Sequence, residues 1–293
     1  MRLGATLITD ESCQAFRAHY ARLRVTAQDD HWLRAALDAL CGYATSVIGC
    51  DAEVGVERTL APDRSSGDRP GADVLLFGLK AKPLARAVMN RTGQCLLTCP
   101  TVEVRVATPE PHQSFTFGDW LRCFGDGFER QDEATGEWVV PVMEGEVRFE
   151  PKVGVARGLA GGVLMLQGAE QAAVLAAARR AAEALAETAG VITPFPGGVC
   201  RSGSKVGSKY RGPVASTNEA FCPTLRERVA TRLVEGARCA YEIVIDGVDE
   251  PAVRGAMAVA MRAAAGDGLL AIGASDLGGR RGGVKIALRD VLR

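Results

Sequence analysis

Length, composition and charge limit the classes of protein that this chain can be. Its 293 residues suffice for one large domain or two of ordinary size, each with a buried core. Its 35 Lys and Arg residues balance its 35 Asp and Glu residues, so no basic surplus indicates nucleic acid and no acidic surplus indicates a disordered tail. Any anion site must therefore be local.

Hydropathy and cysteine content favour a cytoplasmic protein that does not bind membranes. No uninterrupted apolar run reaches about 18 residues, and the N-terminal sequence MRLGATLITD lacks the apolar core of a signal peptide. Nine cysteines, an odd number without a secretory signal, favour reduced thiols over a disulfide framework.

The first half of the chain mixes predicted helices and strands. Apolar residues at helical spacing, preceded by capping residues or with Pro in the first turn, predict helices over Glu11–Val25, His31–Gly42 and Lys82–Thr92. Extended segments are predicted at Thr45–Cys50, Asp73–Leu79, Phe115–Phe124, Trp138–Met143 and Glu146–Phe149, around a turn at Gly125–Gly127.

The second half has a clearer pattern. Strands and helices are predicted in the order Gly162–Gln167 (strand), Ala169–Ala189 (helix), Tyr241–Asp246 (strand), Glu250–Ala265 (helix), Leu269–Ser275 and Gly283–Ala287 (strands). This is the pattern of a split βαβ, or ferredoxin-like, layer. We therefore predict an α+β fold with two ferredoxin-like α/β sandwich lobes, a duplication with mostly antiparallel sheets flanked by helices. The expected domains are residues 1–153 and 154–293, joined near Pro151–Gly158.

A long loop, Val191–Asn218, lies inside the second predicted lobe. It holds four glycines between Gly197 and Gly207, three prolines, and the basic residues Arg201, Lys205, Lys209 and Arg211. Such a segment makes a poor core and a good binding loop. A plain surface connection remains the alternative, although loops longer than about 12 residues are often functional.

A phosphate-binding P-loop is not supported by this segment. Gly198, Gly203, Ser204 and Lys205 give G-x-x-x-x-G-S-K, whereas a P-loop needs G-K-[ST] followed by a helix. No apolar helical run follows Lys205. The three histidines are scattered, and C-x-x-x-C at Cys95 and Cys99 is too long for a thioredoxin-type pair. We therefore expect no metal site and buried, inert cysteines.

The strand Tyr241–Asp246 carries two carboxylates. Side chains alternate along a strand, so Glu242, Val244 and Asp246 share one face. Burial of Glu242 in this apolar segment would raise its pKa and suit it to proton transfer near neutral pH. An edge-strand Glu242 facing water fits the pattern equally well, and for Asp246 a turn role with Gly247 is favoured.

Several strings resemble the formylmethanofuran:tetrahydromethanopterin N-formyltransferase family, and the resemblance covers nearly the whole chain. The strings are PFPGG at 194–198, SGSKVG at 202–207, STNE at 216–219, YEIVIDGVDE at 241–250, SVI at 46–48, RPG at 69–71, GQC at 93–95, LTCPT at 97–101 and FGDG at 124–127. The neutral, Ala- and Arg-rich composition resembles the bacterial branch, the formyltransferase component of the formyltransferase/hydrolase complex, rather than the acidic methanogen proteins.

The resemblance implies a function and an assembly. It implies a cytoplasmic homotetramer that moves a formyl group between N5 of tetrahydromethanopterin and the amine of methanofuran or an analogue. It implies no bound prosthetic group, with the two carriers as co-substrates. The bacterial branch implies formaldehyde oxidation to formate in methylotrophy, with association to the hydrolase components. It places the acid-base carboxylate at Glu242.

Formyl transfer between two nitrogens passes through a tetrahedral intermediate, which sets two chemical requirements. Hydrogen-bond donors must face the oxyanion, and backbone N–H groups of Gly197–Gly207, or the side chains of Ser216 and Asn218, are candidates. A proton must move between the nitrogens, for which Glu242 is the candidate; held protonated, Glu242 could also donate to the oxyanion. The predicted substrate-binding residues are Gly197, Gly198, Arg201, Ser204, Lys205, Ser216, Asn218, Gln94 and Thr98, with Phe195 and Tyr210 as ring walls.

Two alternatives stay open from the sequence. The first is a nucleophilic Cys95 or Cys99 that carries an S-formyl intermediate. The second is a non-catalytic protein that binds the carrier or acts as a scaffold for the hydrolase. The presence of both the loop strings and Glu242 speaks against the scaffold.

Overall fold

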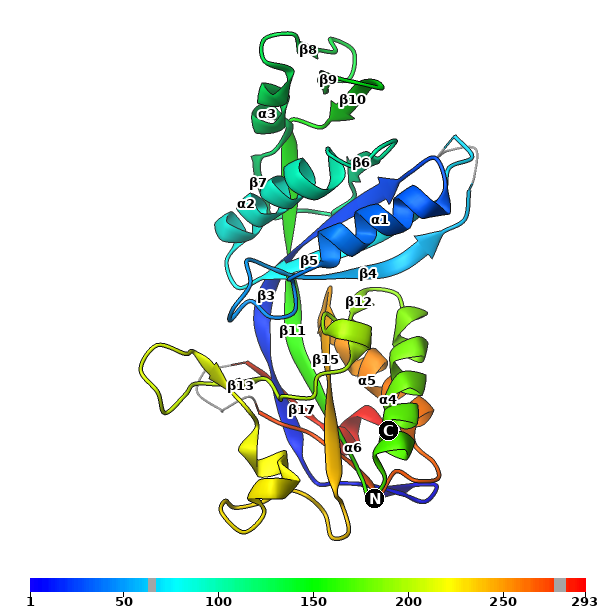
Figure 1. Cartoon of the computed structure of the whole chain (residues 1–293), viewed down its shortest axis with the longest axis vertical. Coiled ribbons are helices and arrows are strands. Elements are labelled where there is room, and N and C mark those ends of the chain that lie inside the picture. Colours follow the sequence, from blue (N-terminus) through cyan, green and yellow to red (C-terminus); the bar gives the residue numbers. More distant parts are fainter. Residues whose placement is uncertain (63–66, 277–282) are drawn as a thin grey trace. The chain divides into compact units, whose positions relative to one another are not determined.

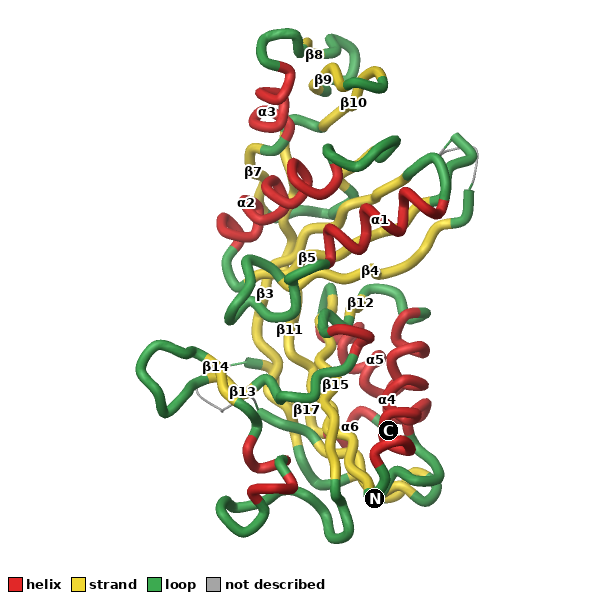
Figure 2. The backbone as a smooth tube through the Cα atoms, in the orientation of Figure 1, coloured by secondary structure: helices red, strands yellow, loops and turns green. Residues whose placement is uncertain are grey.

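The structure, a computed structural model, describes residues 1–62, 67–276 and 283–293 (Figures 1 and 2). The backbone divides into two compact units. Residues 18–158 form one, here called the continuous unit, and residues 1–17 with 159–293 form the other, here called the two-segment unit. Each has its own hydrophobic core.

The continuous unit contains a complete ferredoxin-like layer. Its elements in chain order are β3 (Ser12–Thr26, of which 18–26 belong here), α1 (Asp30–Cys41), β4 (Glu53–Leu60), β5 (Gly71–Gly78), α2 (Ala81–Arg91) and β6 (Glu103–Val106). The strands pair in the order β6-β3-β5-β4, and every pairing is antiparallel. The predicted βαββαβ arrangement is therefore present in the first half.

Further elements follow that layer in the continuous unit. They are the π-helical turn η2 (Thr92–Leu96), β7 (Gln113–Thr116), α3 (Gly118–Leu121), the 3-10 turn η3 (Arg122–Gly125), β8 (Arg130–Gln131), β9 (Trp138–Val142) and β10 (Gly145–Phe149). Strands β10, β9 and β8 form a small antiparallel sheet, and β7 pairs with the first residues of β11 (Lys152–Gly168).

The two-segment unit repeats the same topology. Its elements are β1 (Arg2–Leu3), β2 (Thr6–Ile8), β11 from residue 159 on, α4 (Gln171–Ala186), β12 (Val191–Ile192), the short loop elements η4 (Pro196–Gly198), β13 (Lys205–Val206), β14 (Ala215–Ser216), η5 (Glu219–Phe221) and η6 (Pro223–Leu225), then β15 (Cys239–Gly247), α5 (Glu250–Ala264), β16 (Ala271–Gly273), β17 (Val284–Ala287) and α6 (Leu288–Val291). The central strands pair antiparallel in the order β16-β11-β15-β12.

The N-terminal segment belongs to this second layer because of two strand pairings. Strand β2 pairs with β16, and β17 pairs with residues 12–15 of β3. The structure therefore differs from the predicted division at residues 153 and 154, which assigned residues 1–17 to the first lobe.

Small side chains let α4 and α5 pack closely against the sheet. Each helix buries several alanines, and Figure 1 shows the two helices side by side on one side of β15. Asp249 begins α5 by accepting a hydrogen bond from Ala252 N at 2.8 Å, as Asp29 does for α1 with Trp32 N at 3.1 Å. Within the described ranges, no helix is long and apolar enough to cross a membrane.

The helix predicted over Glu11–Val25 is wrong, because the segment is strand β3. Phe16, Tyr20 and Leu23 fit helical spacing, but the burial of alternate residues follows a two-residue period. The polar residues of the other face are matched across strands: Arg22 binds Glu57 and Arg24 binds Asp73.

Two predicted extended segments also differ from the structure. Thr45–Cys50 is a turn in which Ser46 O accepts from Gly49 N and Cys50 N, and the strand β4 comes later. Phe115–Phe124 is extended only to Thr116 and continues into α3. The sequence does not predict β4, because Glu57 and Arg58 interrupt its apolar pattern. In the structure these two charges are paired with residues of neighbouring strands, Glu57 with Arg22 and Arg58 with Asp73.

Candidate active site

Strand β15 places Glu242 inside the two-segment unit. Ile243 and Ile245 face the core against α4 and α5, so Glu242 lies on the opposite face of the sheet. In Figure 1 the loop segment with β13 lies across β15 from the helices. Glu242 is only 1 % exposed. Of the two interpretations that the sequence left open, the structure therefore shows the buried carboxyl.

The segment after β12 covers Glu242. Cys200 pairs with Glu242 through two backbone hydrogen bonds, Cys200 N to Glu242 O at 2.8 Å and Glu242 N to Cys200 O at 2.9 Å. Four residues later, Ser204 Oγ donates to Glu242 Oε1 at 2.5 Å. The other carboxyl oxygen, Oε2, is buried and has no hydrogen-bond partner among the residues that the structure describes.

Burial raises the pKa of Glu242 to about 7, although hydrogen bonds from the side chain and backbone of Ser204 act in the opposite direction. A carboxyl with this pKa is populated in both protonation states near neutral pH. It can therefore accept a proton and return it without a large energetic cost in either step.

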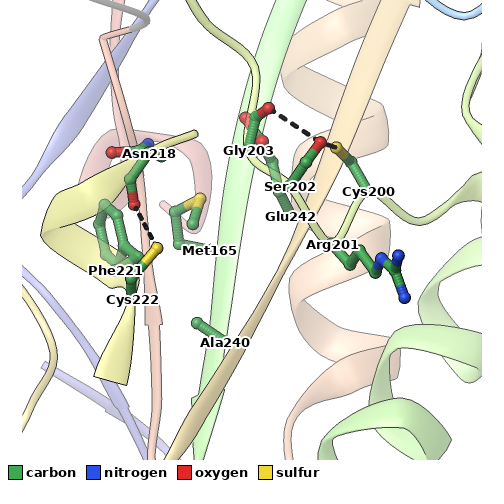
Figure 3. Close-up of a pocket in the computed structure, with 10 residues that line it drawn as sticks. All are labelled: Met165, Cys200, Arg201, Ser202, Gly203, Asn218, Phe221, Cys222, Ala240 and Glu242. Atoms are coloured by element: carbon green, nitrogen blue, oxygen red, sulfur yellow. Dashed lines mark hydrogen bonds between the residues drawn. The ribbon is translucent and has the colours of Figure 1, made fainter. Parts of the chain in front are cut away.

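A small pocket opens on Glu242, and Figure 3 shows the ten residues that line it. They come from β11, β15 and the covering loop: Met165, Cys200, Arg201, Ser202, Gly203, Asn218, Phe221, Cys222, Ala240 and Glu242. The cavity of about 20 Å³ has room for one water-sized group. A formyl group fits this scale, whereas a pterin or furan ring does not.

Glycines shape the loop around the pocket. Gly203 has φ +77°, and a Cβ there would lie 2.5 Å from the Asn218 Cβ. Gly198 has φ +77°, and a Cβ there would approach Ala182 of α4 and Thr193, each at 2.9 Å. Gly197 has φ +62° with open space beside it. Gly203 lines the pocket, whereas Gly197 and Gly198 turn the chain beside α4.

The predicted basic residues differ in their surroundings. Arg201 lines the pocket, is exposed, and directs its guanidinium away from Glu242 in Figure 3. Lys205 Nζ bonds Glu219 Oε1, and this hydrogen bond lowers the pKa of Glu219. Ser216 pairs with Lys205 between β14 and β13. Of Arg201, Lys205 and Ser216, only Arg201 lines the pocket.

Asn218 lies in the pocket wall and is held firmly. It is 8 % exposed, its Nδ2 donates to Ser275 Oγ at 3.0 Å, and its backbone N donates to Ser202 O at 3.2 Å. Phe195 packs partly buried against the core, whereas Tyr210 is 81 % exposed.

Gln94 and Thr98 belong to the continuous unit. Gln94 lies in the π-helical turn η2, and Thr98 Oγ1 donates to Gln94 O at 2.7 Å. Burial raises the pKa of the nearby Cys95 and Cys99 thiols. A raised thiol pKa lowers the thiolate population, so neither cysteine is activated as a nucleophile.

Asp246 has a different role from the predicted turn. It is fully buried in β15, and its Oδ1 accepts from Gly161 N at 2.9 Å, where the register of β11 shifts between Leu159 and Gly162. The carboxylate therefore satisfies a backbone donor that the β-bulge releases from the ladder.

Sequence reasoning missed the apolar and thiol lining of the pocket. Met165 reaches it because β11 pairs with β15 and sets Met165 directly opposite Glu242. Phe221 and Cys222 reach it from η5 and the residue after it. No local pattern predicts these residues, because their positions depend on pairings between distant segments.

The structure also bears on two chemistries considered from the sequence. A strand, β13, begins at Lys205, where a P-loop would begin a helix. In the described part of the chain, no group of three His, Cys, Asp or Glu residues is arranged to hold a metal ion.

Comparisons with known proteins identify the family. The family described as "Formylmethanofuran-tetrahydromethanopterin formyltransferase" matches residues 1–142, and "FTR, proximal lobe" matches residues 145–291. The formylmethanofuran–tetrahydromethanopterin formyltransferase of Methylobacillus flagellatus is 40% identical over 301 residues, covering 100% of both chains. That of Methanothermobacter thermautotrophicus is 40% identical and covers 99% of this chain and 100% of its own.

Solved structures agree with this assignment. The formyltransferase of Methanosarcina barkeri gives a TM-score of 0.91 at 36% identity, covering 99% of this chain and 100% of its own. The formyltransferase/hydrolase complex of Methylorubrum extorquens with methylofuran contains a chain with a TM-score of 0.91 at 38% identity, covering 100% and 99%. The resemblance in the sequence is confirmed: the chain belongs to the formylmethanofuran–tetrahydromethanopterin formyltransferase family of enzymes.

Proposed function

We propose that Glu242 is the proton shuttle for formyl transfer between N5 of tetrahydromethanopterin and the amine of a methanofuran-type carrier. The observation that carries this proposal is a buried carboxyl with a pKa of about 7, one oxygen of which has no partner in the described structure and which lines a small pocket. Buried carboxyls with such a pKa are typical of acid-base catalysts.

The proposed reaction needs no covalent enzyme intermediate. The attacking nitrogen forms a bond to the formyl carbon, and the carbonyl electron pair moves to oxygen. The Glu242 carboxylate takes the proton of the attacking nitrogen and gives it to the leaving nitrogen. The oxygen returns its electron pair to re-form the carbonyl as the old C–N bond breaks. No net proton is gained or lost, so the same groups serve transfer in both directions.

The oxyanion needs donors on the same pocket wall. We propose that backbone N–H groups of the 197–207 loop, which the glycines hold in turns, serve this purpose, with the side chains of Ser216 and Asn218 as further donors. One well-placed donor contributes about 3 to 4 kcal/mol to the stability of such a transition state. Among these groups, Gly203 and Asn218 line the pocket.

The carriers themselves must lie outside the small cavity, with only the formyl group inside. We propose that Arg201, at the pocket wall, and Lys205 meet their anionic tails. Gln94 and Thr98 are further proposed carrier contacts. The π-helical geometry at Gln94 supports this, because such turns are rare and frequently occur at functional sites.

We infer that in the cell the chain works in the cytoplasm as a homotetramer with hydrolase partners, in formaldehyde oxidation to formate. The similar chain in the Methylorubrum extorquens formyltransferase/hydrolase complex supports such a partner. Formyl transfer then runs from the pterin to the methanofuran analogue. Light scattering of the purified chain gives the number of copies in the oligomer, and co-purification from a cell grown on a one-carbon source tests the hydrolase partner.

The central experiment mixes purified chain with formyl-tetrahydromethanopterin and methanofuran and follows the pterin absorbance. Wild-type protein is expected to transfer the formyl group, and Glu242→Gln is expected to lose most of kcat. Retained transfer in Glu242→Gln would keep the family and remove the proposed shuttle.

A further inference from the structure

One hydroxyl group controls the surroundings of the Glu242 carboxyl. Ser204 Oγ to Glu242 Oε1, at 2.5 Å, is the side-chain hydrogen bond that this carboxyl makes within the described structure. The two carboxyl oxygens are therefore inequivalent. Oε1 is occupied by a donor, and Oε2 is left for another partner. A buried polar atom without a partner is costly, so Oε2 is available to a donor that enters the pocket.

The loop holds Ser204 from both sides. On one side, Gly203 has φ +77° and no room for a Cβ, which would lie 2.7 Å from Asn218 N. Ser202 O accepts from Thr217 Oγ1 at 2.8 Å and from Asn218 N at 3.2 Å. On the other side, Lys205 bonds Glu219. Ser204 is thus fixed between two ties to residues 217–219.

The rest of the surroundings offers Glu242 little other polar control. Strand β11 presents Met165, and β15 itself presents Ala240. The covering loop presents the thiol of Cys200, the residue after η5 presents that of Cys222, and the Arg201 guanidinium is directed away. The polar side chains of Ser202 and Asn218 also line the pocket, but they donate elsewhere, Ser202 Oγ to Gly203 O and Asn218 Nδ2 to Ser275 Oγ. Lys205 and Glu219 are bound to each other, and Asp246 accepts from Gly161 N. Ser204 is therefore the group whose loss should alter the carboxyl most.

We infer that Ser204 is a positioning residue: it holds Oε1 of Glu242, so that Oε2 alone exchanges the proton with the two reacting nitrogens. This rests on the proposed shuttle role of Glu242. Before the reaction the hydroxyl donates to the carboxylate. After the proton moves from the attacking nitrogen to Oε2, the hydroxyl still donates to Oε1, now the carbonyl oxygen. The proton then leaves from Oε2 to the departing nitrogen, and Ser204 itself exchanges nothing.

The sign of the expected effect follows from the hydrogen bond. Donation by Ser204 stabilises the carboxylate and lowers the pKa of Glu242, against the larger effect of burial. Removal of the hydroxyl should raise the pKa further above about 7. Since the carboxylate is the reactive form, kcat/KM should decrease as the pH drops below the pKa of Glu242. The acid limb of its pH profile should move up by about one pH unit in Ser204→Ala.

The test compares three variants in pH profiles of kcat/KM. Ser204→Ala should shift the acid limb upward and lower the plateau by about tenfold, and Ser204→Thr should restore both. Ser208→Ala is the matched control, because Ser208 lies in the same loop and its Oγ accepts, among the residues that the structure describes, only a local hydrogen bond from Tyr210 N. An unshifted limb in Ser204→Ala, or no restoration by Ser204→Thr, would overturn the inference.

A second measurement separates this inference from the proposed function. The carboxylic C=O stretch of Glu242, identified as the infrared band absent from Glu242→Gln, can be titrated without any substrate. Ser204→Ala should raise its midpoint by the same unit. If Glu242→Gln remains fully active, the shuttle fails, and the positioning role for catalysis falls with it. If Glu242→Gln is inactive but the infrared midpoint is unmoved in Ser204→Ala, only the inference about Ser204 fails.

Discussion

The two units place a buried carboxyl on the same strand of the same topology, with opposite consequences. In the βαββαβ order, β5 is the third strand of the continuous unit and β15 is the third strand of the two-segment unit. Asp73 on β5 is 0 % exposed and Glu242 on β15 is 1 % exposed. Burial acts to raise the pKa of both carboxyls. The net pKa of Asp73 nevertheless lies below its usual value, whereas that of Glu242 is raised to about 7.

The difference lies in the residues directly across the strands. Asp73 is opposite Arg24 on β3 and Arg58 on β4. Arg24 Nε lies 2.8 Å from Asp73 Oδ1, and Arg58 Nη2 lies 2.7 Å from Asp73 Oδ2. Glu242 is opposite Met165 on β11 and Cys200 on the covering loop. Two cations outweigh burial for Asp73, whereas a thioether and a thiol leave burial dominant for Glu242. One carboxylate is structural, and the other is available for proton transfer.

The largest expected effect comes from removing the available carboxyl. Glu242→Gln keeps the shape and the hydrogen-bonding capacity but cannot exchange a proton, so kcat should fall by about 100- to 10,000-fold. The pterin absorbance assay measures this loss. Circular dichroism of the variant serves as the control for folding. A fall of less than about threefold would show that Glu242 is not the shuttle.

The same variant should change stability with pH. The folded-state pKa of Glu242 is raised from 4.5 to about 7, so the wild type should lose up to about 3 kcal/mol of unfolding free energy as pH rises through this interval. Glu242→Gln lacks this loss. Urea unfolding from pH 5 to pH 8 should therefore show the variant gaining stability over the wild type. Parallel curves would contradict the raised pKa.

A cation opposite Glu242 should make it resemble Asp73. Met165→Lys introduces a charge on the neighbouring strand, which should lower the pKa of Glu242 by about 1 to 3 units and reduce kcat about tenfold through weaker basicity. Met165→Leu, which adds no charge, is the matched control. The acid limb of the pH profile should move to lower pH in Met165→Lys alone. Equal profiles in both variants would refute the electrostatic explanation.

Removing one cation from Asp73 should have a smaller effect than the changes around Glu242. Arg24→Met leaves Arg58 in place, and the Arg24 side chain is 42% exposed, so the expected cost is about 1 kcal/mol. Because the pKa of Asp73 is lowered in the folded state, the stabilisation is present above its unfolded value and is lost as pH falls through the folded value. Urea unfolding should thus separate variant and wild type at pH 7 more than at pH 3.

The control for that prediction is a surface ion pair on α4. Arg179 and Glu183 are spaced i, i+4, and their side chains are 81% and 63% exposed. Arg179→Met should change stability by less than about 0.5 kcal/mol. Formyl transfer should be unaffected by Arg24→Met, and a large loss of activity would remove the distinction between the two carboxyls.

The sequence predicts much of the second half of the fold, because β11 and β15 contain apolar runs, α4 is rich in alanine, and α5 begins at the Asp249 cap. It misassigns β3, because Phe16, Tyr20 and Leu23 fit helical spacing. The alternation of Arg22 and Arg24 is that of a strand, and their partners Glu57 and Asp73 lie across the sheet. The paired charges of strands β3, β4 and β5 are set by long-range pairing that no local pattern contains.

The same limit applies to the active site. The residue type and strand position of Glu242 are visible in the sequence, and the loop 191–218 is visible as a binding segment. The burial of Glu242 is not visible, because it depends on Cys200 pairing with β15 from about 40 residues away in the chain. The hydrogen bond from Ser204, which makes the two carboxyl oxygens unequal, depends on the same fold of the loop.

The way the chain crosses between the units has a consequence for biosynthesis. Residues 18–158 are continuous, so this unit can fold as soon as it leaves the ribosome. Residues 1–17, synthesised first, pair with β16 and β17 near the C-terminus. Strand β2 and the first residues of β3 therefore lack these two partners until β16 and β17 are made. A chain truncated after α5 should leave that N-terminal edge exposed, and such an edge is a site for aggregation.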